Sequence, residues 1–148
     1  MITIHNRQRK YTLDIKKLHT TVQQILEIIN YSDFDIGILL TTNKTIRTYN
    51  LTYRSKDKPT DILSFSYHPE LIPGKRIRAK SEDDKNLGDL ILSIEYIDKI
   101  AKAMGVSLEE RLKVLLVHGI CHLLGYDHES DADYRSMRAK EAYIFRKL

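Results

Sequence analysis

Three histidines near the end of the chain have the type and spacing to bind a metal ion. His118, His122 and His128 lie within eleven residues, at spacings of four and six. Helix residues four apart project from one face, so His118 and His122 would present both imidazoles to a single point. Gly125 can adopt the left-handed conformation that ends a helix sharply and lets the chain reverse. His128 would then approach the first two rings.

Three converging imidazoles are typical of a catalytic zinc site. Structural zinc sites are closed by four protein ligands, whereas catalytic sites use three and leave one coordination position open. The sequence therefore predicts one Zn²⁺ ion and no other cofactor, although nickel, copper or cobalt suits the same ligands. Cys121 lies beside them on the helix and is expected to be a small buried apolar residue rather than a fourth ligand.

Two carboxylates flank the third histidine. Asp127 and Glu129 are candidates for orienting an imidazole from outside the ligand set, or for accepting a proton. Either could equally be a carboxylate that only stabilises a turn.

The helix that carries the first two histidines is expected to be buried. The segment LKVLLVHGICHLLG, residues 112–125, is apolar on nearly every side, which is typical of a helix in the middle of a domain. Its start, Ser107-Leu108-Glu109-Glu110, matches a capping box, and its end is expected near Leu124.

The other elements follow from hydrophobic periodicity and capping residues. Alternation predicts strands over residues 2–5, 61–67 and 87–94, and a β-rich apolar run of strand length predicts another over residues 34–41. Caps and helical periodicity predict four more helices, over about 14–29, 42–57, 95–104 and 130–147. In the last of these, five side chains are expected to face inward at least in part: Tyr134, Met137, Glu141, Ile144 and Phe145.

This order predicts a single α+β domain over residues 1–148, with a small mixed four-stranded sheet packed with about five helices. About twenty mostly polar residues, 68–86, separate the third and fourth strands, which is longer than most connections. That segment is expected to be a functional or mobile loop.

The composition favours a soluble protein with an anionic partner. The chain has 24 Lys and Arg against 20 Asp and Glu, a formal charge of +4, and basic residues attract phosphates. No apolar run is long enough to cross a membrane, and no signal segment follows Met1, so a cytoplasmic location is expected. A single cysteine fits a reducing compartment. The candidates for RNA contacts are Lys56, Lys75, Arg76 and Arg78.

Three stretches resemble the YbeY family of bacterial endoribonucleases. HGICHLLGYDH, residues 118–128, is similar to the family signature H-G-x-L-H-L-x-G-Y-D-H and departs from it only at Cys121. YNLTYRSKDKPTDILSFS, residues 49–66, resembles a second family stretch and places the family's functional arginine at Arg54. Leu87-Gly88-Asp89-Leu90 resembles a third. The 68–86 loop looks longer than is usual in the family.

The resemblance implies a zinc-dependent, single-strand-specific endoribonuclease that acts in 16S rRNA 3'-end maturation and ribosome quality control. Its implied partners are single-stranded RNA, the small ribosomal subunit and its assembly factors, and its implied fold carries a zincin-like metal site. The guanidinium of Arg54 would stabilise charge on the phosphoryl oxygens. The nucleophile, either water or a ribose 2'-hydroxyl, stays open, as do the general base, the cleavage position and the oligomeric state.

Two other functions share the histidine pattern. A zinc metallopeptidase of the metzincin type has the same spacing, but it carries a glutamate base where this chain has Gly119. A non-catalytic ribosome assembly factor would use zinc only to hold its structure together.

Overall fold

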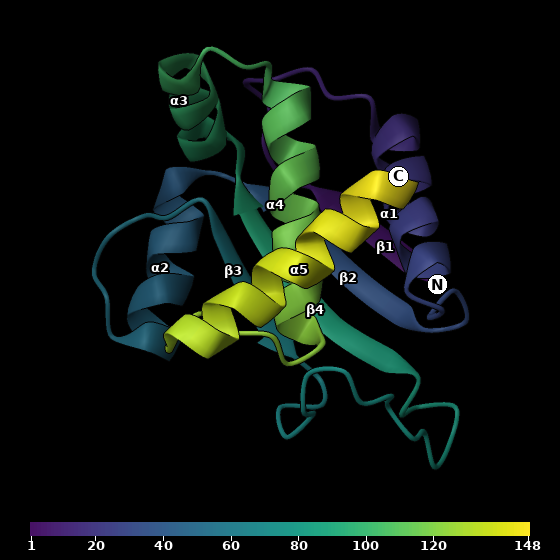
Figure 1. Ribbon diagram of the computed structural model, residues 1–148. Coiled ribbons are helices and arrows are strands. Elements are labelled where there is room, and N and C mark those ends of the chain that lie inside the picture. The colour runs from purple at the N-terminus through teal and green to yellow at the C-terminus, as the bar shows by residue number, and fades with distance from the viewer.

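The computed structural model describes residues 1–148 and shows an α+β fold with one mixed sheet and five helices, as predicted (Figure 1). The elements in chain order are β1 (Ile2–Asn6), α1 (Ile15–Ile28), β2 (Asp35–Thr41), α2 (Asn43–Arg54), β3 (Ile62–Ser66), β4 (Asn86–Ser93), α3 (Ile94–Met104), α4 (Leu108–Leu123) and α5 (Asp131–Lys147). None of the helices is long and apolar enough to span a membrane.

The sheet has the strand order β1-β2-β4-β3. β1, β2 and β4 are parallel, and β3 is antiparallel to β4 at one edge. Asp61 accepts a hydrogen bond from Ser93, and Tyr67 donates one to Leu87. Since the bonded pairs of an antiparallel ladder alternate, the main-chain groups of Ser64 point away from β4, toward the open edge.

Helix α4 lies in the middle of the domain, as its apolar sequence predicts. It packs on β3 and β4 on one side and contacts α1, α3 and α5. Figure 1 shows α5 crossing over α4 on the side away from the sheet. Leu116, Val117 and Ile120 are fully buried in the main core cluster. A helix held on both sides provides a rigid base for functional side chains.

The other face of the sheet is covered mainly by α2. Ile46 of α2 packs against Leu63 and Ile91, with Tyr49 and Phe65 at the margin. The rest of this face is open and forms a cavity of about 640 Å³.

Helix α5 buries fewer side chains than predicted. Met137 and Ile144 are buried and Glu141 is partly buried, whereas Tyr134 and Phe145 are 50% and 37% exposed and lie at the margin of the buried stripe. Only a narrow stripe of α5 meets α4, and the first turn of α5 extends beyond the layer beneath it (Figure 1). Tyr134 instead pairs with Arg138 on the surface.

Candidate metal centre

Helix α4 ends in the turn that its glycine predicts. Gly125 has φ of 92°, and two hydrogen bonds close the end of the helix, from Gly125 N to His122 O at 3.0 Å and from Tyr126 N to Cys121 O at 3.1 Å. This is a Schellman motif, in which a left-handed residue reverses the chain. The reversal brings His128 back toward the last turn of α4.

The three histidines converge, as predicted. One ring nitrogen of each lies within 4.8 Å of one from both others, and the Nε2 atoms of His118 and His122 are 3.1 Å apart. His118 and His122 are partly buried, while His128 is exposed. This group could hold a metal ion.

Hydrogen bonds fix which nitrogen of each buried ring is free. Nδ1 of His122 lies 2.9 Å from the carbonyl oxygen of Tyr126, and Nδ1 of His118 lies 3.1 Å from Oε2 of Glu141. Both partners accept, so in the neutral rings Nδ1 donates and Nε2 carries a lone pair. Two such lone pairs at 3.1 Å suit a shared cation, since tetrahedral Zn–N bonds put ligand atoms roughly 3.3 Å apart.

The surroundings of His122 favour its metal-binding form. Burial lowers the pKa of His122 from its ordinary value, and the charges of His118 and His128 act in the same direction. The carbonyl of Tyr126 and the charge of Asp127 oppose this shift. A metal ion binds the neutral imidazole, so a lowered pKa keeps the ligand available.

Glu141 is a functional candidate that the sequence analysis missed. It was expected to face inward, but no role followed from that expectation. Its side chain is only 15% exposed and contacts His118. The available signal was a carboxylate within the apolar stripe of a helix, because a buried charge needs a partner.

Neither of the two carboxylates predicted for this role forms a hydrogen bond to an imidazole. Asp127 Oδ1 accepts a hydrogen bond from the backbone N–H of His128 at 2.8 Å, so it stabilises the turn. Glu129 is exposed. The observed partners of the imidazoles are thus Glu141 and the carbonyl of Tyr126.

Cys121 is a buried thiol, as expected. It is fully buried, and burial, followed by the charge of Glu141, raises its pKa to about 12. The thiol therefore keeps its proton at neutral pH and is a poor metal ligand.

Gly119 has a structural reason to be glycine. A Cβ at this position would lie 2.7 Å from Cδ1 of Ile62 and 2.9 Å from Cδ2 of Leu90. Position 119 therefore faces the sheet, and its lack of a side chain lets α4 approach β3 and β4. The glutamate base of a metallopeptidase has no room here.

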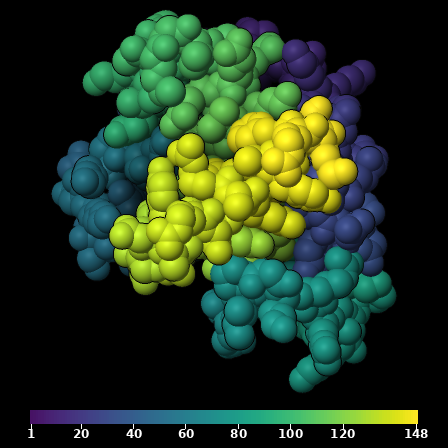
Figure 2. All heavy atoms as spheres, viewed as in Figure 1, coloured from purple at the N-terminus to yellow at the C-terminus, as the bar shows by residue number.

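Arg54 is the last residue of α2, and its exposed guanidinium reaches the open edge of the sheet. Its Nη2 atom lies 3.5 Å from the carbonyl oxygen of Ser64 in β3. Two residues further along β3, the hydroxyl of Ser66 donates to the carbonyl of Leu123, at the end of α4. Arg54 is thus connected through one short strand to the helix end that carries His122. In Figure 2 the blue surface of α2 lies beside the yellow-green start of α5.

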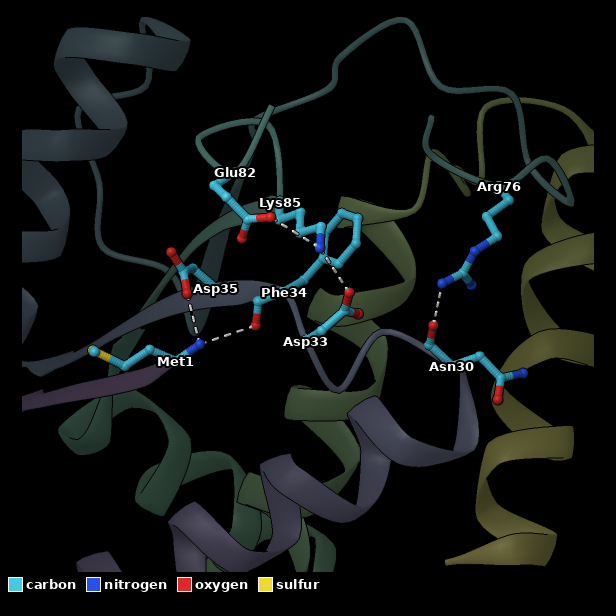
Figure 3. A network of polar contacts seen from close by, with 8 residues as sticks. All are labelled: Met1, Asn30, Asp33, Phe34, Asp35, Arg76, Glu82 and Lys85. Carbon is cyan, nitrogen blue, oxygen red and sulfur yellow. Dashed lines mark hydrogen bonds and ion pairs between the residues drawn. The ribbon is translucent and has the colours of Figure 1, made fainter. Parts of the chain in front are cut away.

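Of the candidate RNA contacts, Lys56, Lys75 and Arg78 are exposed. Arg76 is also exposed but already has structural partners: it donates to the carbonyl of Asn30 at 2.6 Å (Figure 3). Its guanidinium also lies over the ring of Tyr31.

The cavity on the open face of the sheet is not lined by any of the three converging histidines. Its lining on the open face of the sheet includes His5, Asp35, Tyr53, Phe65 and Asp89, and it contains no lysine or arginine. Such a surface does not suit a phosphate backbone.

Comparisons with known proteins agree with the resemblance seen in the sequence. The family model described as Endoribonuclease YbeY matches residues 3–148. The Endoribonuclease YbeY of Homo sapiens is 35% identical over 147 residues, which cover 99% of this chain and 87% of the human protein. That of Sulfurihydrogenibium sp. is 40% identical over 141 residues, covering 93% and 87%.

A solved structure supports the fold. The solution structure of a Thermotoga maritima protein superposes with a TM-score of 0.58 at 22% identity, covering 99% of this chain and 91% of that one. With the matches above, the conclusion is that this chain belongs to the YbeY family of endoribonucleases.

Proposed function

We propose that this protein is a zinc-dependent, single-strand-specific endoribonuclease that acts in 16S rRNA 3'-end maturation and ribosome quality control. It works in the cytoplasm, with the small ribosomal subunit and its assembly factors as partners. Family membership supports the class of reaction, and the histidine cluster supports the requirement for a metal.

The observation that carries the proposal is the facing pair of Nε2 atoms in His118 and His122. Glu141 and the Tyr126 carbonyl hold the two rings so that both lone pairs meet at one point, with His128 as the third ligand. A zinc ion held there supplies Lewis acidity toward a phosphate oxygen. Three protein ligands leave room for substrate.

Arg54 is proposed to bind the phosphate that is cleaved. Its guanidinium has five N–H donors, and a single hydrogen bond, to Ser64, is formed within the protein. The remaining donors can bind two phosphoryl oxygens and stabilise the charge that grows on them in the transition state.

The preference for single strands follows from the partial burial of the ligands. His118 is 30% exposed beneath α5, so a phosphate must approach α4 closely to reach the metal. A flexible single strand bends into such a site more readily than a stiff duplex. Lys56, Lys75 and Arg78 are proposed as backbone contacts along the approach, since lysine and arginine neutralise phosphates without reading the sequence.

The test is digestion of a labelled single-stranded RNA, together with metal analysis of the purified protein. We expect about one zinc per chain, cleavage that chelation abolishes, and its loss in His122→Ala and Arg54→Ala. Arg146→Ala, which removes the same charge from an exposed site on α5, serves as the control and should cleave normally.

Three results would contradict the proposal. Metal-loaded protein that never cuts RNA would favour the non-catalytic assembly factor, and chelator-sensitive cleavage of casein would favour a peptidase. An equal loss of RNA cleavage in Arg54→Ala and Arg146→Ala would show that Arg54 has no specific role in the reaction. The end groups of the RNA decide the nucleophile, because a 2',3'-cyclic phosphate requires attack by the ribose hydroxyl.

A further inference from the structure

The segment between β3 and β4, residues 67–85, connects the metal centre to a distant corner of the fold. It has no helix or strand of its own. It nevertheless contacts the turn after α4 at one place and the α1–β2 corner, residues 29–34, at another.

At the first place the segment packs against the turn that follows α4. A Cβ on Gly125 would collide with the carbonyl of Leu71 and meet Cδ of Pro73 at 3.6 Å. Leu71 and Tyr126 also both pack against the main core cluster. Residues 71–73 thus lie directly against the turn at Gly125.

At the second place two adjacent residues hold the segment to the corner. Nη2 of Arg76 donates to the carbonyl of Asn30 at 2.6 Å (Figure 3). Its guanidinium carbon lies 4.4 Å from the centre of the Tyr31 ring. The backbone N–H of Ile77 donates to the hydroxyl of Tyr31 at 2.8 Å, and the Ile77 side chain is buried. A stacked, hydrogen-bonded arginine and a buried isoleucine make a firm attachment.

The two places are only three residues apart along the chain. Pro73 lies at the metal-bearing turn and Arg76 at the corner, so a movement of one would be passed to the other. Lys85 forms a further link, at 3.4 Å from Asp33, but that pair is solvent-exposed and adds little. The position of residues 71–73 therefore depends on Arg76 and Ile77, in addition to the packing of Leu71 against the core and its hydrogen bond to His68.

The turn at Gly125 and Tyr126 in turn positions two of the three histidines. The carbonyl of Tyr126 accepts from Nδ1 of His122 and so sets the orientation of that ring. His128 follows two residues later. A turn that moved away from α4 would loosen one ligand and misplace another.

We propose that Arg76 is a positioning residue for the metal centre. By helping to fix residues 71–73, it holds the Gly125–Tyr126 turn in the form that orients His122 and presents His128. This rests on the proposed function only in requiring that the three histidines bind a metal ion. The proposal gives Arg76 a different role from Lys75 and Arg78 of the same segment, which are proposed to contact RNA.

Metal affinity without RNA tests the proposal, by competition for Zn²⁺ with a chromophoric chelator. Arg76→Ala should raise the Zn²⁺ dissociation constant about three- to tenfold, a size typical of residues that act through others. Arg78→Ala is the matched control: it removes the same charge from the same segment at an exposed position, and its metal affinity should equal that of the wild type.

A conservative variant and a spectroscopic measurement distinguish a positioning role of Arg76 from a general loss of stability. Arg76→Lys keeps a cation over Tyr31 and a donor for Asn30, so it should restore most of the affinity. The visible absorption of the Co²⁺-loaded protein reports ligand geometry directly, and it should change in Arg76→Ala but not in Arg78→Ala.

Equal metal affinities and equal Co²⁺ spectra for Arg76→Ala and Arg78→Ala would overturn the inference, and an effect of Arg76→Ala on RNA affinity alone would make Arg76 an RNA contact. Failure of the proposed function looks different. In that case RNA stays uncut, while Arg76→Ala still weakens metal binding and Arg78→Ala does not.

Discussion

Nδ1 of His118 in α4 and Oε2 of Glu141 in α5 lie 3.1 Å apart, although 23 positions separate them in the chain. The carboxylate fixes the tautomer of the ring and orients its Nε2 atom toward the other histidines. The C-terminal helix thereby contributes to the metal centre.

Replacing Glu141 with glutamine should therefore weaken metal binding. Glutamine keeps the size of the side chain but removes the negative charge that faces Nδ1. We expect the zinc dissociation constant to rise about 10- to 100-fold, measured by chelator competition. Glu129→Gln, at an exposed position beside the third ligand, is the control. A smaller effect at Glu141 than at Glu129 would assign the orienting role to Glu129 instead.

Adding a side chain at Gly119 should destabilise the fold and create no peptidase. The methyl group of Gly119→Ala would force the side-chain ends of Ile62 and Leu90 to shift. Overpacking of about 1–3 kcal/mol is then partly offset by about 1 kcal/mol of helix propensity that alanine gains over glycine. Denaturant unfolding of the metal-free protein measures it. Gly119→Glu should be worse and should leave casein intact. A stable Gly119→Glu variant that cleaves casein would mean that this position faces the metal after all.

The metal site could be predicted from the sequence because its determinants are local. His118 and His122 are one turn apart on a helix, and the break at Gly125 is visible in the residue type. A period of two or of 3.6 likewise marked each strand and helix. These features depend on neighbours along the chain, so they need no knowledge of the fold.

The remaining features depend on contacts between distant segments, which periodicity does not contain. Nothing near Glu141 in the sequence indicates His118 as its partner. Arg76 reads as one of several basic loop residues until Tyr31 is seen beneath it. The spacing of Tyr134 fits the apolar stripe of α5, but its side chain is 50% exposed and its hydroxyl accepts a hydrogen bond from Arg138.

Comparing alanine substitutions at Gly125 and Gly105, which both have left-handed backbones, should measure how much the packing at the metal-bearing turn contributes to stability. Gly125 and Gly105 both end helices, with φ of 92° and 72°. A Cβ on Gly125 would strike the carbonyl of Leu71, whereas one on Gly105 would have open space. Gly105→Ala should cost about 1 kcal/mol from backbone strain alone, and Gly125→Ala should cost more and also weaken zinc binding. Equal unfolding free energies for the two variants would show that Leu71 moves aside freely.

Removal of the metal should lower the free energy of unfolding only while His118, His122 and His128 are all present. An ion that binds only the folded state stabilises it by RT ln(1 + [L]/Kd), about 2.7 kcal/mol at a hundredfold excess over Kd. Excess zinc should therefore raise the melting temperature of the wild type, and chelator should reverse the rise. His122→Ala should lose this response, while His19→Ala, an exposed histidine on α1, should keep it. An equal response in both variants would place the bound ion away from the three converging imidazoles, because a site that lacks one of its three ligands cannot bind zinc as tightly.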